Sequence, residues 1–182
     1  MFEQVSQVLR ANRFEVSCFQ TASAAAEYPD SAIDGKTVAI GGSHTAQEMG
    51  LYERLKTHNF VYFNAAEQRT PAQRDALMMA SLATDIYITS VNGLSESTGE
   101  LVNIDGGGNR LASGLFGHEK VYFIIGTNKV APDLEGAIWR ARNIAGPKNA
   151  RRLGKKTTCA VRADRCYDCK HPDPICAAMV LY

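Results

Sequence analysis

Four short apolar runs, separated by segments with helical patterns, narrow the possible folds of this sequence more than any other feature. The runs cover residues 37–40, 60–63, 85–89 and 121–125. Apolar runs of this length fit strands that are buried on both faces, and the helices between them fit crossovers that join parallel strands. The alternation therefore predicts an α/β fold with a largely parallel sheet flanked by helices.

Further segments of the first half extend this pattern. Apolar residues at helical spacing predict a helix over residues 1–11, and Thr70-Pro71 predicts the start of another helix. Residues 45–56 are expected to form one continuous helix. Alternating residues at positions 14–19 predict an additional strand, with Cys18 buried as a small apolar side chain.

The second half of the chain contains a glycine-rich region and a long helical pattern. Ser97-Thr98-Gly99 is expected to turn a hairpin between two short strands. A helix is predicted from Pro132 onward, and Gly146-Pro147 is expected to end it. The apolar residues 177–182 fit either a final strand or a docking helix.

The size and composition of the chain restrict the class of protein. It has 182 residues, of which 45% are hydrophobic and 21% are charged, and this fits a single domain over residues 1–182 rather than a disordered chain. No apolar run approaches the roughly 18 residues of a membrane span. The first residues also lack the pattern of a secretion signal. We therefore expect a cytoplasmic protein that has no membrane partner.

Charge is distributed unevenly along the chain. Residues 1–139 contain 10 Lys and Arg against 16 Asp and Glu, whereas residues 140–182 contain 10 against 3. The basic segment is explained either by a solvated surface or by an anionic partner, such as a phosphorylated ligand or an acidic protein. Aromatic residues are not interleaved with the basic ones, so nucleic acid is not the expected partner.

Four of the five cysteines lie close together, in the pattern Cys159-x6-Cys166-x2-Cys169-x6-Cys176. Four neighbouring thiolates repel one another, and a soft metal bound between them offsets the repulsion. The spacing therefore predicts a metal-binding segment over residues 159–176. A [4Fe–4S] cluster is slightly favoured over zinc, because zinc sites commonly use two Cys-x2–4-Cys pairs and only one is present. Free or redox-paired thiols are the alternative.

Small and polar residues follow several predicted strands, at the end of the sheet where ligands bind in open α/β folds. Glycine amides, hydroxyls, side-chain amides and two basic residues suit a small anionic metabolite. Neither G-x-G-x-x-G nor the P-loop pattern is present, which argues against a dinucleotide enzyme or a P-loop nucleotide hydrolase. The predicted ligand-binding residues are Gly41, Gly42, Ser43, Thr45, Asn92, Gly106, Gly107, Gly108, Asn109, Arg110, Asn128 and Lys129.

Glu96 is the candidate catalytic residue. It is the carboxylate of the glycine-rich region that has hydroxyl side chains on both sides, from Ser95, Ser97 and Thr98. A carboxylate in such surroundings could serve as a nucleophile or as a base. The alternative interpretation is an exposed residue of the hairpin.

Several motifs of the sequence resemble those of the lactate utilisation (LUD) domain family. They are Gly41-Gly42-Ser43-His44-Thr45, residues 84–92 and 99–106, Gly108-Asn109-Arg110, and Gly126-Thr127-Asn128-Lys129, followed by the cysteine pattern. The resemblance implies a Rossmann-like α/β fold, similar to that of the ribose-5-phosphate isomerase and CoA-transferase-like superfamily. It also implies that the glycine–serine turn and the glycine-rich loop bind phosphorylated or CoA-like ligands, and that Glu96 lies near the carboxylate that CoA transferases use.

The resemblance further implies a place in organic-acid metabolism. The expected function is that of an accessory protein or subunit in an iron–sulfur-dependent oxidation of lactate or a related acid, with other lactate-oxidation subunits as partners. The alternative is an enzyme of acyl or CoA transfer, or of sugar-phosphate isomerisation, with a structural zinc. A third class is a non-catalytic sensor or scaffold whose basic segment docks an acidic partner. The sequence leaves open whether the chain is an enzyme and whether it forms a homodimer.

Overall fold

The computed structural model describes residues 2–182, which form two compact units. Residues 17–90 and 112–125 form the first, here named the parallel-sheet unit. Residues 2–16, 91–111 and 126–182 form the second, the cysteine unit. Within the part of the chain that is described, no helix is long and apolar enough to cross a membrane.

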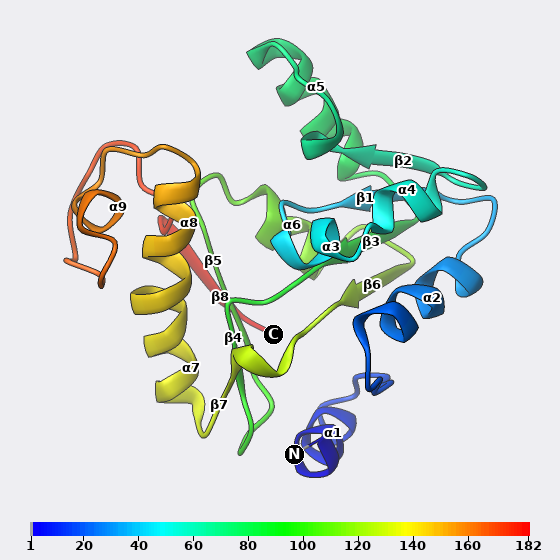
Figure 1. Ribbon diagram of the computed structural model, residues 1–182, viewed down its shortest axis with the longest axis horizontal. Helices are drawn as coiled ribbons and strands as arrows, with labels where there is room; N and C mark the ends of the chain where they lie inside the picture. Colours follow the sequence, from blue (N-terminus) through cyan, green and yellow to red (C-terminus); the bar gives the residue numbers. More distant parts are fainter. Residues whose placement is uncertain (1) are drawn as a thin grey trace. The chain divides into compact units, whose positions relative to one another are not determined.

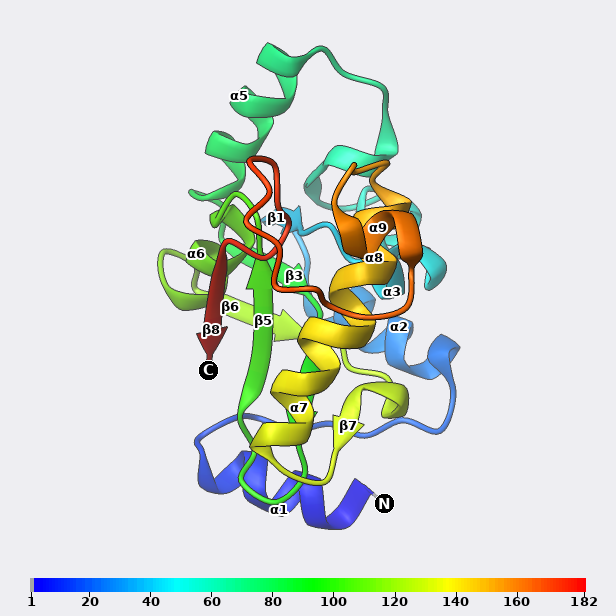
Figure 2. The same cartoon turned by 90° about the vertical axis from the view of Figure 1, so that its left-hand side faces the viewer.

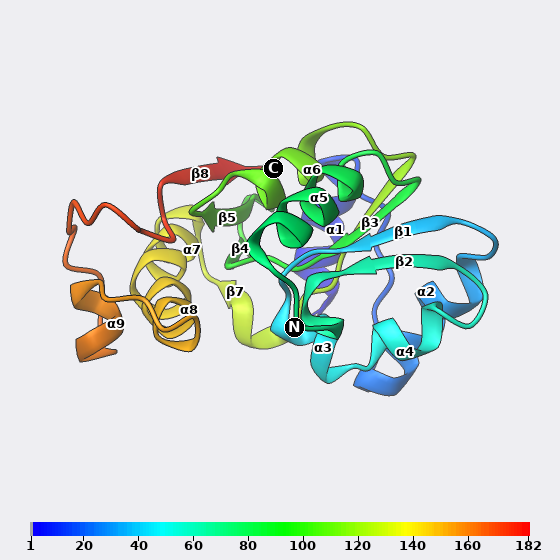
Figure 3. The ribbon, with the colours of Figure 1, turned by 90° about the horizontal axis from the view of Figure 1, so that it is seen from above.

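The parallel-sheet unit contains the sheet that the four apolar runs predict. Its strands are β1 (Thr37–Ile40), β2 (Phe60–Phe63), β3 (Ile86–Thr89) and β6 (Lys120–Phe123). They lie in the order β2-β1-β3-β6, and every neighbouring pair is parallel (Figure 1). Figure 3 shows β1 and β2 side by side. The predicted α/β fold with a parallel sheet flanked by helices is confirmed.

Short helices connect these strands, and one predicted helix is interrupted. Residues 45–56 form two helices rather than one, because Gly50 takes a left-handed conformation with φ of 64°, which an L side chain would resist. The helix that starts after Thr70 is confirmed, with Thr70 and Gln73 forming a reciprocal capping box. The helices are α2 (Ala22–Ala32), α3 (His44–Glu48), α4 (Leu51–Leu55), η1 (Asn64–Ala66), α5 (Pro71–Ser81) and α6 (Asn109–Leu115), the last of which contains a crossing from one unit to the other.

One hydrophobic core joins α2, α3 and α4 to the sheet. Leu51 and Leu55 of α4 are fully buried and belong to the same cluster as Val38 of β1 and Ile88 of β3. Full burial of a side chain of this size contributes about 1.5–3 kcal/mol. This cluster therefore fixes the sheet independently of the cysteine segment.

The cysteine unit contains a second, mixed sheet. Its strands are β4 (Gly93–Ser95), β5 (Leu101–Asp105), β7 (Val130–Ala131) and β8 (Ala178–Leu181), in the order β7-β4-β5-β8. The antiparallel pair of β4 and β5 confirms the predicted hairpin. Strand β8 pairs with β5 in antiparallel register, so the apolar residues near the end of the chain form a strand and not a helix (Figure 2).

The cysteine unit also contains helices and short helical turns. They are α1 (Phe2–Ala11), the short turn η2 (Thr127–Lys129), α7 (Leu134–Arg140), the π-helical turn η3 (Ala141–Ala145), α8 (Gly146–Arg152) and α9 (Thr158–Arg162). Helix α1 confirms the predicted N-terminal helix within the described residues. Figure 2 shows α7 leading through η3 into α8 as one helical run.

The expected end of this helix at Gly146-Pro147 is wrong, because a π-helical turn before Pro147 accommodates the proline within the helix. Pro147 has no N–H, and in an α-helix its ring would collide with the carbonyl four residues earlier, that of Asn143. The Gly146 N–H instead bonds to the carbonyl of Ala141, five residues earlier, which is the π-helical pattern. The wider turn makes room for the ring, and the helix continues to Arg152.

The predicted strand over residues 14–19 is also wrong. The segment is irregular and pairs with no strand of the described chain, and it contains the point after Val16 where the chain passes from one unit to the other. Cys18 is exposed rather than buried. An alternating pattern produces a strand only where a neighbouring strand takes up its N–H and C=O groups, and no strand among residues 2–182 pairs with this segment.

Candidate metal centre

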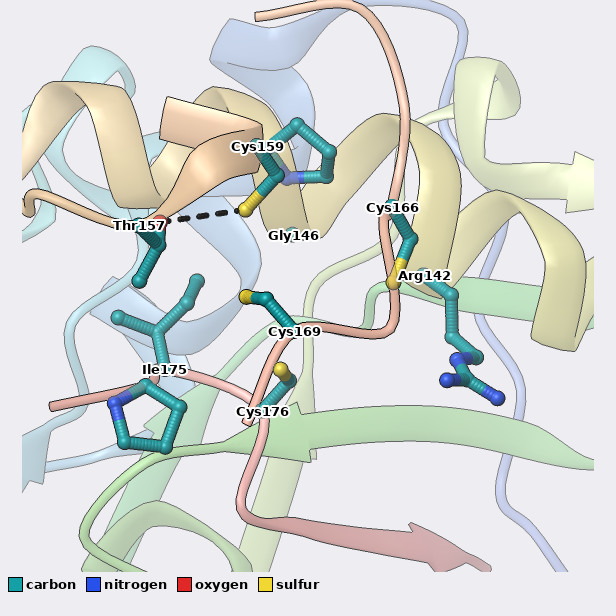
Figure 4. A pocket seen from close by; sticks show the side chains of 10 residues that line it. Arg142, Gly146, Thr157, Cys159, Cys166, Cys169, Ile175 and Cys176 are labelled. Carbon is teal, nitrogen blue, oxygen red and sulfur yellow. Dashed lines mark hydrogen bonds between the residues drawn. The ribbon is translucent and has the colours of Figure 1, made fainter. Parts of the chain in front are cut away.

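All four clustered cysteines line one small pocket of the cysteine unit (Figure 4). Gly146 and Pro147 at the start of α8 form one wall, and the loop of residues 163–177 forms another. The space between them is about 20 Å³, which is enough for one water-sized body. The sulfurs are thus brought together as the sequence spacing suggests.

Cys159 is the buried member of the set and lies in the first turn of α9. The hydroxyl of Thr157, itself buried, accepts the N–H of Ala160 and so caps this helix. The same hydroxyl lies 3.3 Å from the Cys159 sulfur. Cys159 packs with Ala150, Ala160 and Ile175 in a small apolar cluster, which holds α9 against α8.

An irregular segment carries Cys166 and Cys169. Asp168 lies between them in a left-handed conformation, with φ of 49°. Its N–H donates to the Cys166 sulfur at 3.3 Å. This bond helps to hold the sulfur in place within the pocket.

The surroundings of the pocket disfavour the charged form of one of its thiols, that of Cys176. Partial burial and then the nearby Cys166, Cys159 and Cys169 raise the pKa of the Cys176 thiol, and Arg142 opposes this effect. The negative charge of Cys166, together with Asp168, in turn raises the pKa of Arg142. A bound cation would remove this repulsion, so the donor set fits a soft metal.

The arrangement is short of a finished coordination shell. Within residues 2–182, no three or more His, Cys, Asp or Glu side chains are arranged to hold a metal ion. None of the five cysteines forms a disulfide. The four sulfurs share a pocket without converging on one point, and the predicted metal site stays a prediction.

The predicted ligand-binding residues are divided between the two units. Gly41, Gly42, Ser43 and Thr45 follow β1 in the parallel-sheet unit, and the remaining eight belong to the cysteine unit. The Ser43 hydroxyl accepts the Ala46 N–H at 3.2 Å and caps α3. An added Cβ at Gly41 would overlap the hydroxyl of Tyr87, so this glycine also serves the packing of the unit.

Arg110 and Asn92 are joined in one hydrogen-bond network of the cysteine unit. The Arg110 guanidinium donates to the side-chain oxygens of Asn92 and Asn103, at 2.9 and 3.0 Å, and to the Ile104 carbonyl at 2.6 Å. Asn103 is fully buried on β5. These bonds tie the start of α6 to the sheet, and the proposed contact of Arg110 with an anion stays a prediction.

The glycine-rich loop touches the cysteine loop, which its sequence does not reveal. A Cβ on Gly106 would lie 2.5 Å from the Pro174 carbonyl oxygen and 3.0 Å from the Ile175 Cα. Both are backbone atoms directly before Cys176. Gly106 therefore permits the close approach of the two loops, while Gly107, Gly108 and Asn109 continue the turn into α6.

The other predicted residues lie in the same unit. Asn128 and Lys129 form part of η2, and Arg140 donates to the Asn128 carbonyl at 2.8 Å. Glu96 directly follows β4 and is half-buried, and its N–H donates to the Ala131 carbonyl at 2.8 Å. Its catalytic role stays a prediction.

Two residues of the site were missed by the sequence analysis. Arg142 lines the pocket, and Asn143 accepts the Cys166 N–H at 3.2 Å. Both belong to η3. The isolated Gly146-Pro147 pair inside a helical pattern is the one signal of an unusual turn there, and the same pair is typical of a helix end.

Comparison with known proteins identifies the chain at the level of its family. No curated protein matches the chain. The family model of the LUD domain matches residues 2–181, which is nearly the whole chain. The protein therefore belongs to the LUD domain family and is related to lactate utilisation.

Proposed function

We propose that the protein is an accessory protein or subunit in the metal-dependent oxidation of lactate or a related organic acid. In this proposal it binds an anionic metabolite and carries a metal centre on Cys159, Cys166, Cys169 and Cys176. The observation that carries the proposal is that all four cysteines line one pocket in a chain of the LUD family. Other subunits of the oxidation system are the proposed partners.

Each wall of the pocket contributes to holding a thiolate-bound metal. Cys159 is fixed on a capped helix, Cys166 accepts an N–H at its sulfur, and Arg142 supplies a positive charge. These groups hold, orient and charge-balance the ligands. An iron–sulfur cluster would supply one-electron transfer, and a zinc ion would only clamp the segment.

The two metals differ in the space that they need. The present space of about 20 Å³ would take a single ion, with the sulfurs moving in to roughly 2.3 Å from the metal. A four-iron cluster requires the loop of residues 163–177 to move outward. Ile175 and Tyr167 of that loop pack against Ala150 of α8 and Cys159 and Ala160 of α9 through side chains, and these contacts would have to adjust.

Metal analysis of anaerobically purified protein tests the proposal. We expect iron with acid-labile sulfide, or zinc, in a constant ratio to the chain, and an electron-paramagnetic signal after reduction in the iron case. Cys169→Ser should lower the metal content, whereas Cys18→Ser, at an exposed cysteine outside the pocket, should leave it unchanged. Fully folded wild-type protein that takes up neither iron nor zinc would refute the metal centre.

The second candidate is acyl or CoA transfer, or sugar-phosphate isomerisation, with zinc as a structural clamp. It is favoured by the half-buried position of Glu96, directly after Ser95 in the chain, whose hydroxyl bonds to that of Thr98 at 2.6 Å. We expect Glu96→Gln to abolish turnover of a CoA ester or phosphosugar while leaving ligand affinity nearly unchanged. Absence of turnover by the wild type across both substrate classes would eliminate this candidate.

A further inference from the structure

The π-helical turn η3 presents two side chains to the cysteine loop. The Gly146 N–H reaches back five residues to the Ala141 carbonyl, which inserts an extra residue into the turn. Arg142 and Asn143 lie within this turn and both contact the segment around Cys166. Such inserted turns are common at functional sites because they redirect side chains from the regular helical face.

Asn143 holds the backbone of a cysteine through an oriented side chain. Its Oδ1 accepts the Cys166 N–H at 3.2 Å, and its Nδ2 donates to the Trp139 carbonyl at 3.1 Å. The second bond fixes which way the amide points. The position of Cys166 is thereby linked to the helix and not only to its own loop.

Arg142 lies beside the same cysteine (Figure 4). Its Nη2 donates to the Asp168 carboxylate at 2.7 Å, and the Asp168 N–H donates to the Cys166 sulfur at 3.3 Å. Arg142 is the one cationic side chain among the described residues that line the pocket. Arg162 and Arg165 instead lie over the ring of Tyr167.

Four thiolates around a divalent ion or a doubly charged cluster core leave a net charge of about −2. Positive charge and hydrogen bonds next to the sulfurs strengthen metal binding and raise the reduction potential of a cluster. In the described geometry, Arg142 supplies positive charge at the pocket. Asn143 holds the backbone of Cys166 in place.

We infer that Arg142 and Asn143, carried by η3, are positioning residues of the metal centre, Arg142 by its charge and Asn143 by its bond to Cys166. The inference rests on the proposed function. Neither residue is a metal ligand in it. Their effect is on the affinity of the site and, for a cluster, on its potential.

A Co²⁺ titration of the thiol-reduced protein, with a competing chelator, tests both roles without any activity assay. Thiolate-to-cobalt absorption reports ligation, and the chelator gives the affinity. We expect Arg142→Gln and Asn143→Ala to weaken Co²⁺ binding by roughly 10–100-fold, the usual loss when an outer hydrogen-bond partner is removed. Arg142→Lys should recover most of the loss, because it keeps the charge.

Arg162→Gln is the matched control, since it removes an arginine of the same segment that contacts Tyr167 and does not line the pocket. It should bind Co²⁺ as the wild type does. If the wild type carries a reconstituted iron–sulfur cluster, Arg142→Gln should also lower its midpoint potential, and Arg162→Gln should leave it unchanged. Circular dichroism of each variant checks that the fold is intact.

The outcomes separate the inference from the proposed function. Equal Co²⁺ affinity of the wild type, Arg142→Gln and Asn143→Ala overturns the inference and leaves the metal centre in place. An equal loss in Arg142→Gln and Arg142→Lys overturns the role of charge. A wild type that binds neither Co²⁺ nor iron overturns the metal centre itself.

Discussion

Replacing Gly106 by alanine should disturb the cysteine loop from outside the cysteine segment. The new Cβ would lie 2.5 Å from the Pro174 carbonyl oxygen and 3.0 Å from the Ile175 Cα. Both are backbone atoms, so the loop itself must retreat, by about 0.5–1 Å, to relieve the overlap. Cys176 follows directly and moves with it.

The loss in the free energy of unfolding caused by this movement can be estimated from similar changes in other proteins. Overpacking of this kind destabilises by about 1–3 kcal/mol, which for a chain of this size lowers Tm by roughly 2–12 °C. Displacement of one of four metal ligands should weaken Co²⁺ binding by roughly 10–100-fold, as the loss of a supporting partner does. Circular-dichroism melting and chelator competition measure the two effects separately.

Gly107→Ala is the matched control in the same loop. Its Cβ would meet only the Asn109 side-chain oxygen, at 3.3 Å, and a side chain can move aside. Gly107 is also absent from the glycines with a left-handed backbone. The reasoning fails if Gly106→Ala melts and binds Co²⁺ as Gly107→Ala does.

Two further predictions concern stability. The pKa of Asp85 lies below its ordinary value, chiefly because the Thr37 N–H and hydroxyl donate to its carboxylate. Its stabilising effect is therefore present above the unfolded-state value of about 3.9 and is lost as pH falls through the lowered folded-state pKa. Urea unfolding at pH 7 to 2 should show wild type and Asp85→Asn converging only at the acidic end, and a gap independent of pH would contradict this. Thr157→Ala removes the cap of α9 and should cost about 0.5–2 kcal/mol, with Thr157→Ser close to the wild type; equal melting of both variants would show that the hydroxyl is not needed.

The strands of the parallel-sheet unit could be predicted closely from the sequence. Val38 and Ile40 belong to a run so apolar and so short that a doubly buried strand is the natural outcome, and the structure places β1 over the same residues. Thr70 with Pro71 marked a helix start for an equally local reason, the capping of free N–H groups. Features set by neighbours in sequence were thus predictable.

Features set by distant neighbours were not predictable. The alternation at positions 14–19 lacks a partner strand, and no local pattern reports that absence. Pro147 usually stops a helix, and the π turn that tolerates it depends on packing on both sides of η3. Arg142 and Asn143 were missed for the same reason, since the turn decides which way they face.

The metal-site prediction shows the same division. The spacing of Cys166 and Cys169 indicated a shared site, and the pocket brings all four cysteines together. The cysteine spacing could not show that Gly106 supports the loop, because the contact joins residues about 70 positions apart along the chain. Glycine-rich segments suggest ligand binding, and close packing is an equally good use of a missing side chain.

The loop with Cys166, Cys169 and Cys176 is fastened at both ends, by α9 before it and by the pairing of β8 with β5 after it. A segment held in this way has already lost much of its conformational freedom before any metal arrives. The core of the parallel-sheet unit contains no part of it. Removal of a metal bound by this loop is therefore expected to leave the rest of the chain folded, so that the metal could be returned without refolding the protein.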